Sequence, residues 1–221
     1  MDKPRPGAPA PEDASSSASD ELEPPAPEPA EQLVAAGPFL VGQILIAMPG
    51  IGDPRFDRTV LMLCAHDENQ AMAIVLNRPL QGLSVPALLA RLGMAADTVP
   101  EAPVMYGGPV ERERGYVLHT DDFSSAESTL EVGNGVALTD TREVLEALGD
   151  ELRRPRRSLL ALGYAGWGSG QLEQELQQGV WLTCEADEDL LFDRDHGSKW
   201  DRALAKIGVT ADRLSVQAGR A

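Results

Sequence analysis

The sequence predicts an α+β fold of one domain, in which helices pack on a mixed, strongly curved sheet. Short apolar runs rich in Val, Ile and Leu are bounded by turn residues, which is typical of strands covered on both faces. Several runs are joined by connections too short for a crossover helix, so antiparallel pairing must be present. Segments with helical periodicity lie between the runs and supply the layer that covers the sheet.

The first three predicted strands lie between residues 43 and 77. The first spans about Gln43–Met48, and the following segment, Pro49–Thr59, contains too much Gly and Pro for regular structure. The second and third strands, about 60–65 and 71–77, are separated by the short connection His66–Gln70. A connection of that length favours an antiparallel hairpin.

The middle of the chain predicts one helix and several short strands. Ser84 is placed to cap the helix, with Pro86 in its first turn and Gly93 just past its end. Its apolar residues fall on one face, which we expect to be buried: Val85, Leu88, Leu89 and Leu92. The predicted strands are Val104–Tyr106, Tyr116–Thr120, and a hairpin of Thr129–Val132 with Val136–Thr139.

The last part of the chain predicts two more strands and four helical segments. Asp140, with Glu143 three residues on, begins a helix that buries Val144, Leu145 and Leu148. The remaining elements, in order, are a strand at Arg157–Tyr164, a helix at Ser169–Gln178 capped by Ser169, a strand at Val180–Glu185, a helical turn at Asp187–Leu191, and a helix from Ser198 to Gly208. The final helix places Trp200, Ala203, Leu204 and Ile207 on one face.

The N-terminal segment, residues 1–36, has a composition unlike the rest. It is rich in Pro, Ala, Ser and acidic residues and contains no aromatic residue. Such a segment cannot bury enough apolar surface to offset its ordering entropy, so we expect a disordered tail. The remaining residues, 37–221, are enough for a single domain with a sizeable core.

The chain is acidic, with a formal net charge of −16. The tail contributes −6 from two basic and eight acidic residues, which leaves −10 for residues 37–221. An acidic domain repels nucleic acids and anionic membrane surfaces, so we expect no nucleic-acid partner. We interpret the one dense basic run, Arg153-Arg154-Pro155-Arg156-Arg157, as a solvated helix-to-strand connection, with a phosphate-binding patch as the alternative.

The lack of long apolar runs and the placement of the two cysteines lead us to expect a protein of a reducing, aqueous compartment. No run of about 18 apolar residues and no apolar signal segment is present, so we expect no membrane association. Cys64 and Cys184 lie in strand-like apolar runs, where we expect buried, reduced thiols of a cytoplasmic protein.

Four stretches combine glycine with polar or aromatic residues where a predicted strand ends. Glycine permits a positive φ and close backbone approach, so these stretches are able to form a cleft with backbone donors, a guanidinium and an indole. The alternative is structural, with glycines at bends and Asn77 and Arg78 tying loops together. The candidate cleft residues are Met48, Pro49, Asp53, Asn77, Arg78, Gly107, Gly108 and Trp167.

No catalytic residue, metal site or cofactor site is assigned from the sequence. The segment Gly166–Glu173 lacks the Lys-Ser/Thr pair of a phosphate-binding loop, and Ser169 is not flanked by the glycines of a nucleophile elbow. His66, His119 and His196 each lie near carboxylates in the sequence, but none has metal-motif spacing. We expect His66 and His119 to have hydrogen-bonded structural roles.

The same stretches resemble the YqgE/AlgH family of bacterial proteins. The resemblance is carried by Leu45–Pro49 with Asp53-Pro54 and Arg58-Thr59-Val60, by His66 and Asn77-Arg78-Pro79, by Gly107–Val110 with Arg114–His119, and by Gly163–Trp167 with Gly170–Glu173. It extends over about residues 37–221. Gln70 and Ala73 depart from it, because glycine is usual in the family at both positions, and Ser169 stands where proline is common.

The resemblance implies a bifurcated, largely antiparallel sheet, part of which closes as a small barrel, surrounded by helices. It implies no catalytic residues, metal or cofactor, and the family carries a transcriptional-regulator label. We therefore favour a non-enzymatic, cytoplasmic regulatory or interaction protein. The alternatives are an enzyme or small-molecule binder that uses the candidate cleft and, third, a direct DNA-binding regulator. A protein partner and the oligomeric state stay open.

Overall fold

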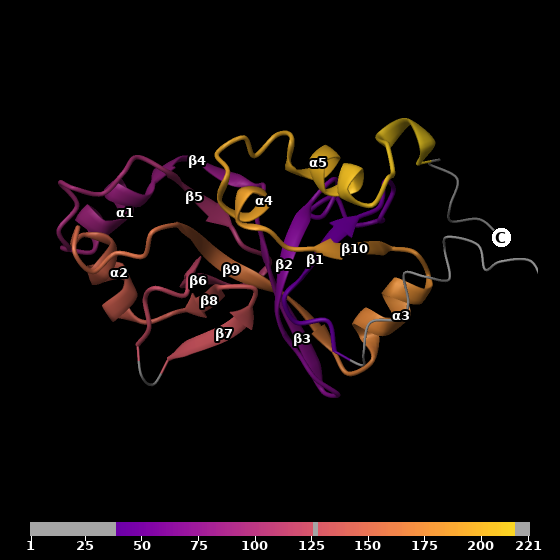
Figure 1. The fold of residues 1–221 in the computed structure, drawn as a ribbon, viewed down its shortest axis with the longest axis horizontal. Coiled ribbons are helices and arrows are strands. Elements are labelled where there is room, and N and C mark those ends of the chain that lie inside the picture. Colours follow the sequence, from indigo (N-terminus) through magenta and orange to yellow (C-terminus); the bar gives the residue numbers. More distant parts are fainter. Residues whose placement is uncertain (1–38, 126–127, 215–221) are drawn as a thin grey trace, which may run out of the picture. The chain divides into compact units, whose positions relative to one another are not determined.

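One long strand, β9 (Ser158–Gly168), runs through the middle of the sheet and joins its two branches (Figure 1). Its first half pairs with β6 (Val110–Thr120) and β5 (Pro103–Tyr106), and its second half pairs with β3 (Gln70–Val75). The change of partners occurs just after Gly163, whose φ is 75°, because Tyr164 pairs with Val110 on β6 and Ala165 pairs with Ala73 on β3. The sheet is therefore bifurcated, with β9 as the shared strand.

The structure is a computed structural model that describes residues 39–125 and 128–214. These residues belong to one compact unit, which is bounded by Ala36 and Ala221. The predicted tail, residues 1–36, lies outside the described residues. No helix in the described ranges is long and apolar enough to cross a membrane.

The first branch curls into a half-barrel. Its strands are all antiparallel, in the order β10 (Trp181–Glu185), β1 (Gln43–Ala47), β2 (Val60–His66), β3, β9. In a flat sheet, the four steps from β10 to β9 would span roughly 19 Å. The rings of Trp167 on β9 and Trp181 on β10 are instead only 5.7 Å apart between centroids. The branch therefore closes around these two side chains.

The second branch contains β6, β8 (Val136–Thr139) and β7 (Thr129–Gly133), which are antiparallel, and β4 (Pro79–Ser84), which pairs with β5. The parallel pairing of β5 with β9 makes the sheet mixed, although antiparallel pairs dominate among the described strands. The predicted hairpins, β2–β3 and β7–β8, are both confirmed. The α+β class with a curved, largely antiparallel sheet is confirmed as well.

Five α-helices of the described ranges cover this sheet (Figure 1). α1 (Val85–Arg91) and α2 (Arg142–Leu148) contribute to the apolar core of the second branch, and α3 (Gln171–Gln177) contributes Leu172 to the interior of the half-barrel. α4 (Glu188–Phe192) and α5 (Lys199–Lys206) pack on the largest core, which contains both Cys64 and Cys184. A short 3₁₀ turn follows at Ala211–Arg213.

Several boundaries differ from the predictions for identifiable reasons. β4 is not predicted, because its residues are polar or half-exposed and form no apolar run. β9 continues through Trp167 to Gly168, where a turn is predicted, and its exposed glycines alternate there with buried Ala165 and Trp167. Leu92 follows the end of α1 and is 45% exposed, so the expectation of a buried Leu92 is wrong.

Three helix caps also differ from the predictions. Thr141, rather than Asp140, is the N-cap of α2, and it makes no side-chain capping bond. Gly170, rather than Ser169, is the N-cap of α3, and the Ser169 hydroxyl donates to the backbone carbonyl of Glu68 at 2.6 Å. Ser198 begins α5 as predicted but makes no side-chain capping bond. Two side chains from the first turn of α5 bind neighbouring segments instead. Lys199 Nζ donates to the carbonyls of Leu190 and Leu191, both at 2.6 Å, and Trp200 Nε1 donates to the carbonyl of Ala47 at 2.8 Å.

Candidate functional site

Asn77 fastens the loop Pro49–Thr59 to the end of the sheet. Its Oδ1 accepts the backbone N–H of Val60 at 3.0 Å, and its Nδ2 donates to the carbonyl of Arg58 at 2.9 Å. The neighbouring Arg78 guanidinium donates to the carbonyl of Asp57. A single amide thus satisfies a donor and an acceptor that the irregular loop would otherwise leave unpaired.

Gly107 and Gly108 cross β9 at very short range. The N–H of Gly107 donates to the carbonyl of Leu162, and its carbonyl accepts the N–H of Val75, both at 2.9 Å. A Cβ atom on Gly107 would lie 2.1 Å from the Gly163 oxygen, and one on Gly108 would lie 2.0 Å from the carbonyl carbon of Tyr164. No side chain fits at this crossing, so both glycines are required by packing.

The remaining candidate cleft residues lie in two different environments. Met48 and Pro49 follow β1 at the same end of the sheet where Asn77 follows β3. Val60 shows this, because it pairs with Ile46 of β1 and its own carbonyl accepts the N–H of Leu76 at 2.8 Å. Asp53 sits in the loop and binds the Arg55 guanidinium, with a shortest contact of 2.6 Å. Hydrogen bonds to Arg55 hold the pKa of Asp53 below its usual value.

Trp167 lies inside the half-barrel rather than beside the glycines. Its indole is 6% exposed, and its Nε1 donates to Glu175 Oε2 at 2.8 Å. Trp181 Nε1 donates to the same oxygen at 2.7 Å. The structure therefore brings together Asn77, Arg78, Gly107 and Gly108 and places Met48 and Pro49 at the same end of the sheet. Trp167 instead pairs with Ala71 near the start of β3 and packs against Trp181 inside the half-barrel.

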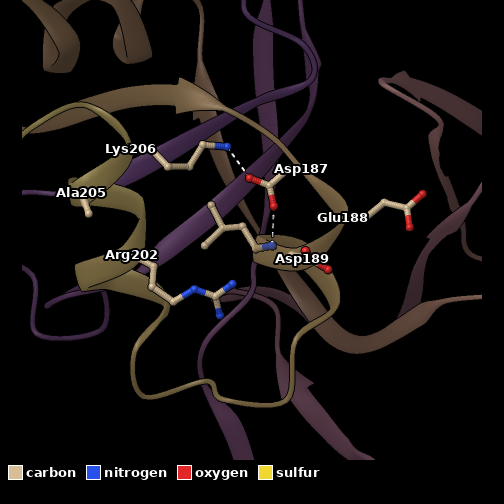
Figure 2. Close-up of a pocket in the computed structure, with 7 residues that line it drawn as sticks. Asp187, Glu188, Asp189, Arg202, Ala205 and Lys206 are labelled. Carbon is tan, nitrogen blue, oxygen red and sulfur yellow. Dashed lines mark hydrogen bonds and ion pairs between the residues drawn. The ribbon is translucent and has the colours of Figure 1, made fainter.

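A hollow of about 730 Å³ lies between α4 and α5 (Figure 2). Its charged lining is neutralised by ion pairs within the described chain. Lys206 pairs with Asp187, Arg202 with Asp193 at 2.6 Å, Glu188 with Arg156 at 2.6 Å and Asp189 with Arg157 at 3.1 Å. Figure 2 shows the first of these pairs, together with the Asp187 oxygen that caps α4. The hollow thus offers no unpaired charge to a ligand.

A second hollow, of about 410 Å³, adjoins the glycine crossing. It is lined by Leu80, Tyr106, Arg112, Glu113 and Leu162. Tyr106 directly precedes Gly107, and its backbone N–H donates to the carbonyl of Arg78 at 2.7 Å. Tyr106 and Arg112 are not among the site residues predicted from the sequence. The aromatic residue before Gly107-Gly108 is a signal for Tyr106, and no local pattern marks Arg112.

Comparisons with known proteins agree on one family. A family model described as AlgH-like matches residues 44–212. A Caulobacter vibrioides relative, a UPF0301 protein, is 64% identical over 186 residues, which span 84% of this chain and 95% of the relative.

The chain belongs to the AlgH-like family.

Solved structures agree with this assignment. The solution structure of the AlgH protein from Pseudomonas aeruginosa is 41% identical, has a TM-score of 0.65, and is matched over 85% of this chain and 98% of that one. A crystal structure of a Corynebacterium diphtheriae protein is 17% identical with a TM-score of 0.59, over 74% and 84% of the two chains, and shows only that the fold is shared.

His66 of this AlgH-like chain forms a pair with Glu173 that looks like part of a catalytic triad. Its Nε2 lies 2.6 Å from Glu173 Oε1. Its Nδ1 accepts the backbone N–H of Leu40 at 3.0 Å, so neither ring nitrogen is left to activate a nucleophile. His66 is the last residue of β2 and is buried, which agrees with the expected hydrogen-bonded role.

His119 is fully buried and fully hydrogen-bonded. Its Nδ1 donates to the carbonyl of Thr120 at 2.8 Å, and its Nε2 accepts from the Thr139 hydroxyl at 2.9 Å. Burial lowers the pKa of His119, which keeps the ring neutral. Burial likewise lowers the pKa of His196, whose ring nitrogens have no hydrogen-bond partner among the described residues.

The cysteines of the AlgH-like chain are chemically quiet. Both are free and buried, and burial raises the pKa of Cys64 to about 12 and that of Cys184 to about 11. A thiol with so high a pKa is a poor nucleophile at neutral pH. Within residues 39–125 and 128–214, no group of His, Cys, Asp and Glu side chains is placed to hold a metal ion.

Proposed function

We propose that this member of the AlgH-like family is a non-enzymatic regulatory or interaction protein of the bacterial cytoplasm. One observation carries the proposal: the side chains that most resemble catalytic groups are committed to internal bonds, apart from His196, whose ring nitrogens, unbonded within the described chain, are buried away from any substrate. The ring nitrogens of His66 and His119, the indoles of Trp167 and Trp181, and the carboxylate of Glu175 all have partners within the chain. A catalytic group needs a reactive atom within reach of its substrate.

Direct DNA binding is the weaker form of this proposal. The basic run has four arginines, and each is paired with a carboxylate: Arg153 with Glu143, Arg154 with Glu151, Arg156 with Glu188, and Arg157 with Glu188 and Asp189. Paired arginines release few counterions from DNA, so we expect no specific binding at physiological salt. Submicromolar binding to one operator, lost when these arginines are replaced, would favour the DNA-binding alternative instead.

The experiment that tests the proposal distinguishes a catalytic role of the protein from a non-catalytic one. A bacterium lacking its own copy of the gene is compared with the parent by transcript profiling, and the deletion is complemented with wild type or with Glu173→Gln. The variant removes the charge needed for a His–Glu catalytic pair but keeps an amide oxygen that accepts from His66. We expect both proteins to restore the profile. A folded Glu173→Gln protein that fails to restore it would favour an enzyme.

The domain organisation is part of the proposal. Residues 37–221 form the AlgH-like domain, and residues 1–36 form a disordered acidic tail that the domain does not need in order to fold. The composition of the tail supports this division. Deletion of residues 1–36 tests it.

A further inference from the structure

The hollow beside the glycine crossing is formed by an irregularity in β6. Val110 pairs with Tyr164 and Gly115 pairs with Leu162, so five steps along β6 oppose two steps along β9. Three extra residues therefore bulge from the sheet, and Glu111 adopts a positive φ of 47°. Bulges re-aim side chains and are over-represented beside binding sites, and a positive φ is costly for a residue with a side chain.

The bulge contains four consecutive charged residues, Glu111 to Arg114, which divide into two pairs. The outer two are committed: Arg114 binds Glu111 at 3.0 Å and also Asp140, and Glu111 accepts from the Tyr116 hydroxyl at 3.2 Å. The inner two, Arg112 and Glu113, have no ion-pair partner among residues 39–125 and 128–214, and both line the hollow. The two cations that line the hollow between α4 and α5, Arg202 and Lys206, are both ion-paired, whereas Arg112 lines its hollow without an ion-pair partner in the described chain.

Gly163, at the bend of β9, allows the bulge to lie close against the sheet because it has no side chain. A Cβ atom on Gly163 would lie 2.6 Å from the Gly108 oxygen, 2.7 Å from the Val110 oxygen and 3.2 Å from the Cα atom of Arg112. The glycine motifs therefore build this hollow rather than line it. They bring the backbones of β5, β6 and β9 close enough for Tyr106, Arg112 and Leu162 to share one wall.

We infer that this hollow binds a small zwitterion with an apolar body, the chemistry of a free α-amino acid with an aromatic or aliphatic side chain. Leu80, Leu162 and the ring of Tyr106 supply apolar surface for the body of the ligand. Arg112 presents a guanidinium to the carboxylate, and Glu113 presents a carboxylate to the ammonium. The inference goes beyond the proposed function and does not depend on it.

The test uses L-phenylalanine and two analogues that each lack one charge. Each compound is titrated into the ¹⁵N-labelled full-length protein, and the backbone amide shifts of residues 80, 106, 112, 113 and 162 are followed. We expect saturable shifts with phenylalanine, and binding at least about tenfold weaker for 3-phenylpropanoate, which lacks the ammonium, and for phenethylamine, which lacks the carboxylate. L-leucine in a parallel titration distinguishes an aliphatic from an aromatic preference.

Arg112→Gln and Glu113→Gln show which group each charge contacts. Arg112→Gln is expected to weaken phenylalanine binding by about tenfold while leaving phenethylamine binding unchanged, and Glu113→Gln is expected to spare 3-phenylpropanoate instead. Arg91→Gln is the matched control, because Arg91 is also exposed and lacks an ion-pair partner in the described chain, and it should bind like wild type.

Three results would overturn the inference. They are no saturable shift at these residues with phenylalanine or leucine, equal binding of phenylalanine and 3-phenylpropanoate, and an Arg112→Gln variant that binds as tightly as wild type. Both substitutions are at exposed positions, so the variants are expected to fold.

Discussion

Nε2 of His66 lies 2.6 Å from Glu173, while Nδ1 of the same ring accepts the backbone N–H of Leu40 at 3.0 Å. A neutral imidazole has one donor and one acceptor nitrogen, so Nε2 carries the hydrogen and donates to the carboxylate. The ring therefore joins the start of the described chain to α3. Its role is to position these segments, and the pair makes a direct prediction about stability.

His66→Ala should cost far more stability than Glu173→Gln. The histidine is buried, and its removal leaves both a cavity and an amide without an acceptor, which together cost about 2–4 kcal/mol. Glu173→Gln keeps an acceptor at a side chain that is 41% exposed, so the loss should stay below about 1 kcal/mol. Urea unfolding of the two variants measures both values. Equal losses would contradict the structural role assigned to the ring.

The pH dependence of stability should reflect His119. Burial lowers its pKa in the folded chain below 6.5, so in that range the unfolded chain binds the proton and the folded chain does not. Stability is then fully present above pH 6.5 and falls as the pH drops, by up to about 1.4 kcal/mol per pH unit. The lowered pKa of His196 acts in the same direction.

Thermal melts between pH 7.5 and pH 5.5 check this prediction. His119→Asn keeps a side-chain N–H donor but does not titrate, so its stability should be lower overall and should fall less steeply with acid. His196→Gln should flatten the profile by the same reasoning. An unchanged slope in both variants would show that other groups set the acid response.

Gly107 and Gly168 give a matched test of close packing, because neither needs a positive φ. A Cβ atom on Gly107 would lie 2.1 Å from a backbone oxygen, so Gly107→Ala must move β5 or β9 and should cost more than about 3 kcal/mol. A Cβ atom on Gly168 meets nothing within 4 Å. Gly168→Ala should be neutral or stabilise by up to about 1 kcal/mol, as chemical denaturation can show.

Much of this fold is predictable because its strands are continuous apolar runs between turn residues. This pattern predicts β1, β2, β3 and β10. The short connection from His66 to Gln70 predicts that β2 and β3 form a hairpin. β4 escapes prediction because it is a half-exposed strand of the second branch with no apolar run. The full extent of β9 is also not predicted, because Gly166 and Gly168 resemble turn residues, although they alternate with buried Ala165 and Trp167 as residues of a strand do.

The site was less predictable than the fold, because it depends on tertiary contacts. The sequence marks Gly107, Gly108 and Trp167 equally, yet only the curl of the half-barrel determines that Trp167 points to Trp181 and Glu175. The bulge that exposes Arg112 and Glu113 depends on strand register, which no local pattern in Glu111–Arg114 reveals.

Deletion of residues 1–36 should leave the domain nearly unchanged. A disordered segment contributes no packing, so the melting temperature should move by less than about 2 °C. Differential scanning calorimetry of the full chain and of residues 37–221 provides the comparison. A larger fall, or slow amide exchange within the first 36 residues, would show that the tail docks on the domain.

Substitutions of Arg78 and Asn77 distinguish a structural role of this motif from a binding role. Arg78 is half-buried and its guanidinium donates to the Asp57 carbonyl, so Arg78→Ala should destabilise the fold by about 1–3 kcal/mol. Asn77→Ala should cost at least as much, because the Val60 N–H and the Arg58 carbonyl both lose their partner.

Arg91→Ala, at an exposed site without an ion-pair partner in the described chain, should stay within about 0.5 kcal/mol of wild type. Thermal and urea unfolding of the three variants decide the matter. If Arg78→Ala melts like Arg91→Ala, its guanidinium is free for a ligand or partner, and the structural reading of the Asn77-Arg78 motif fails. If Arg78→Ala and Asn77→Ala both lower the stability, the role of the motif is to hold the Pro49–Thr59 loop against the sheet. Binding would then have to be sought at neighbouring surfaces such as the Tyr106–Arg112 hollow.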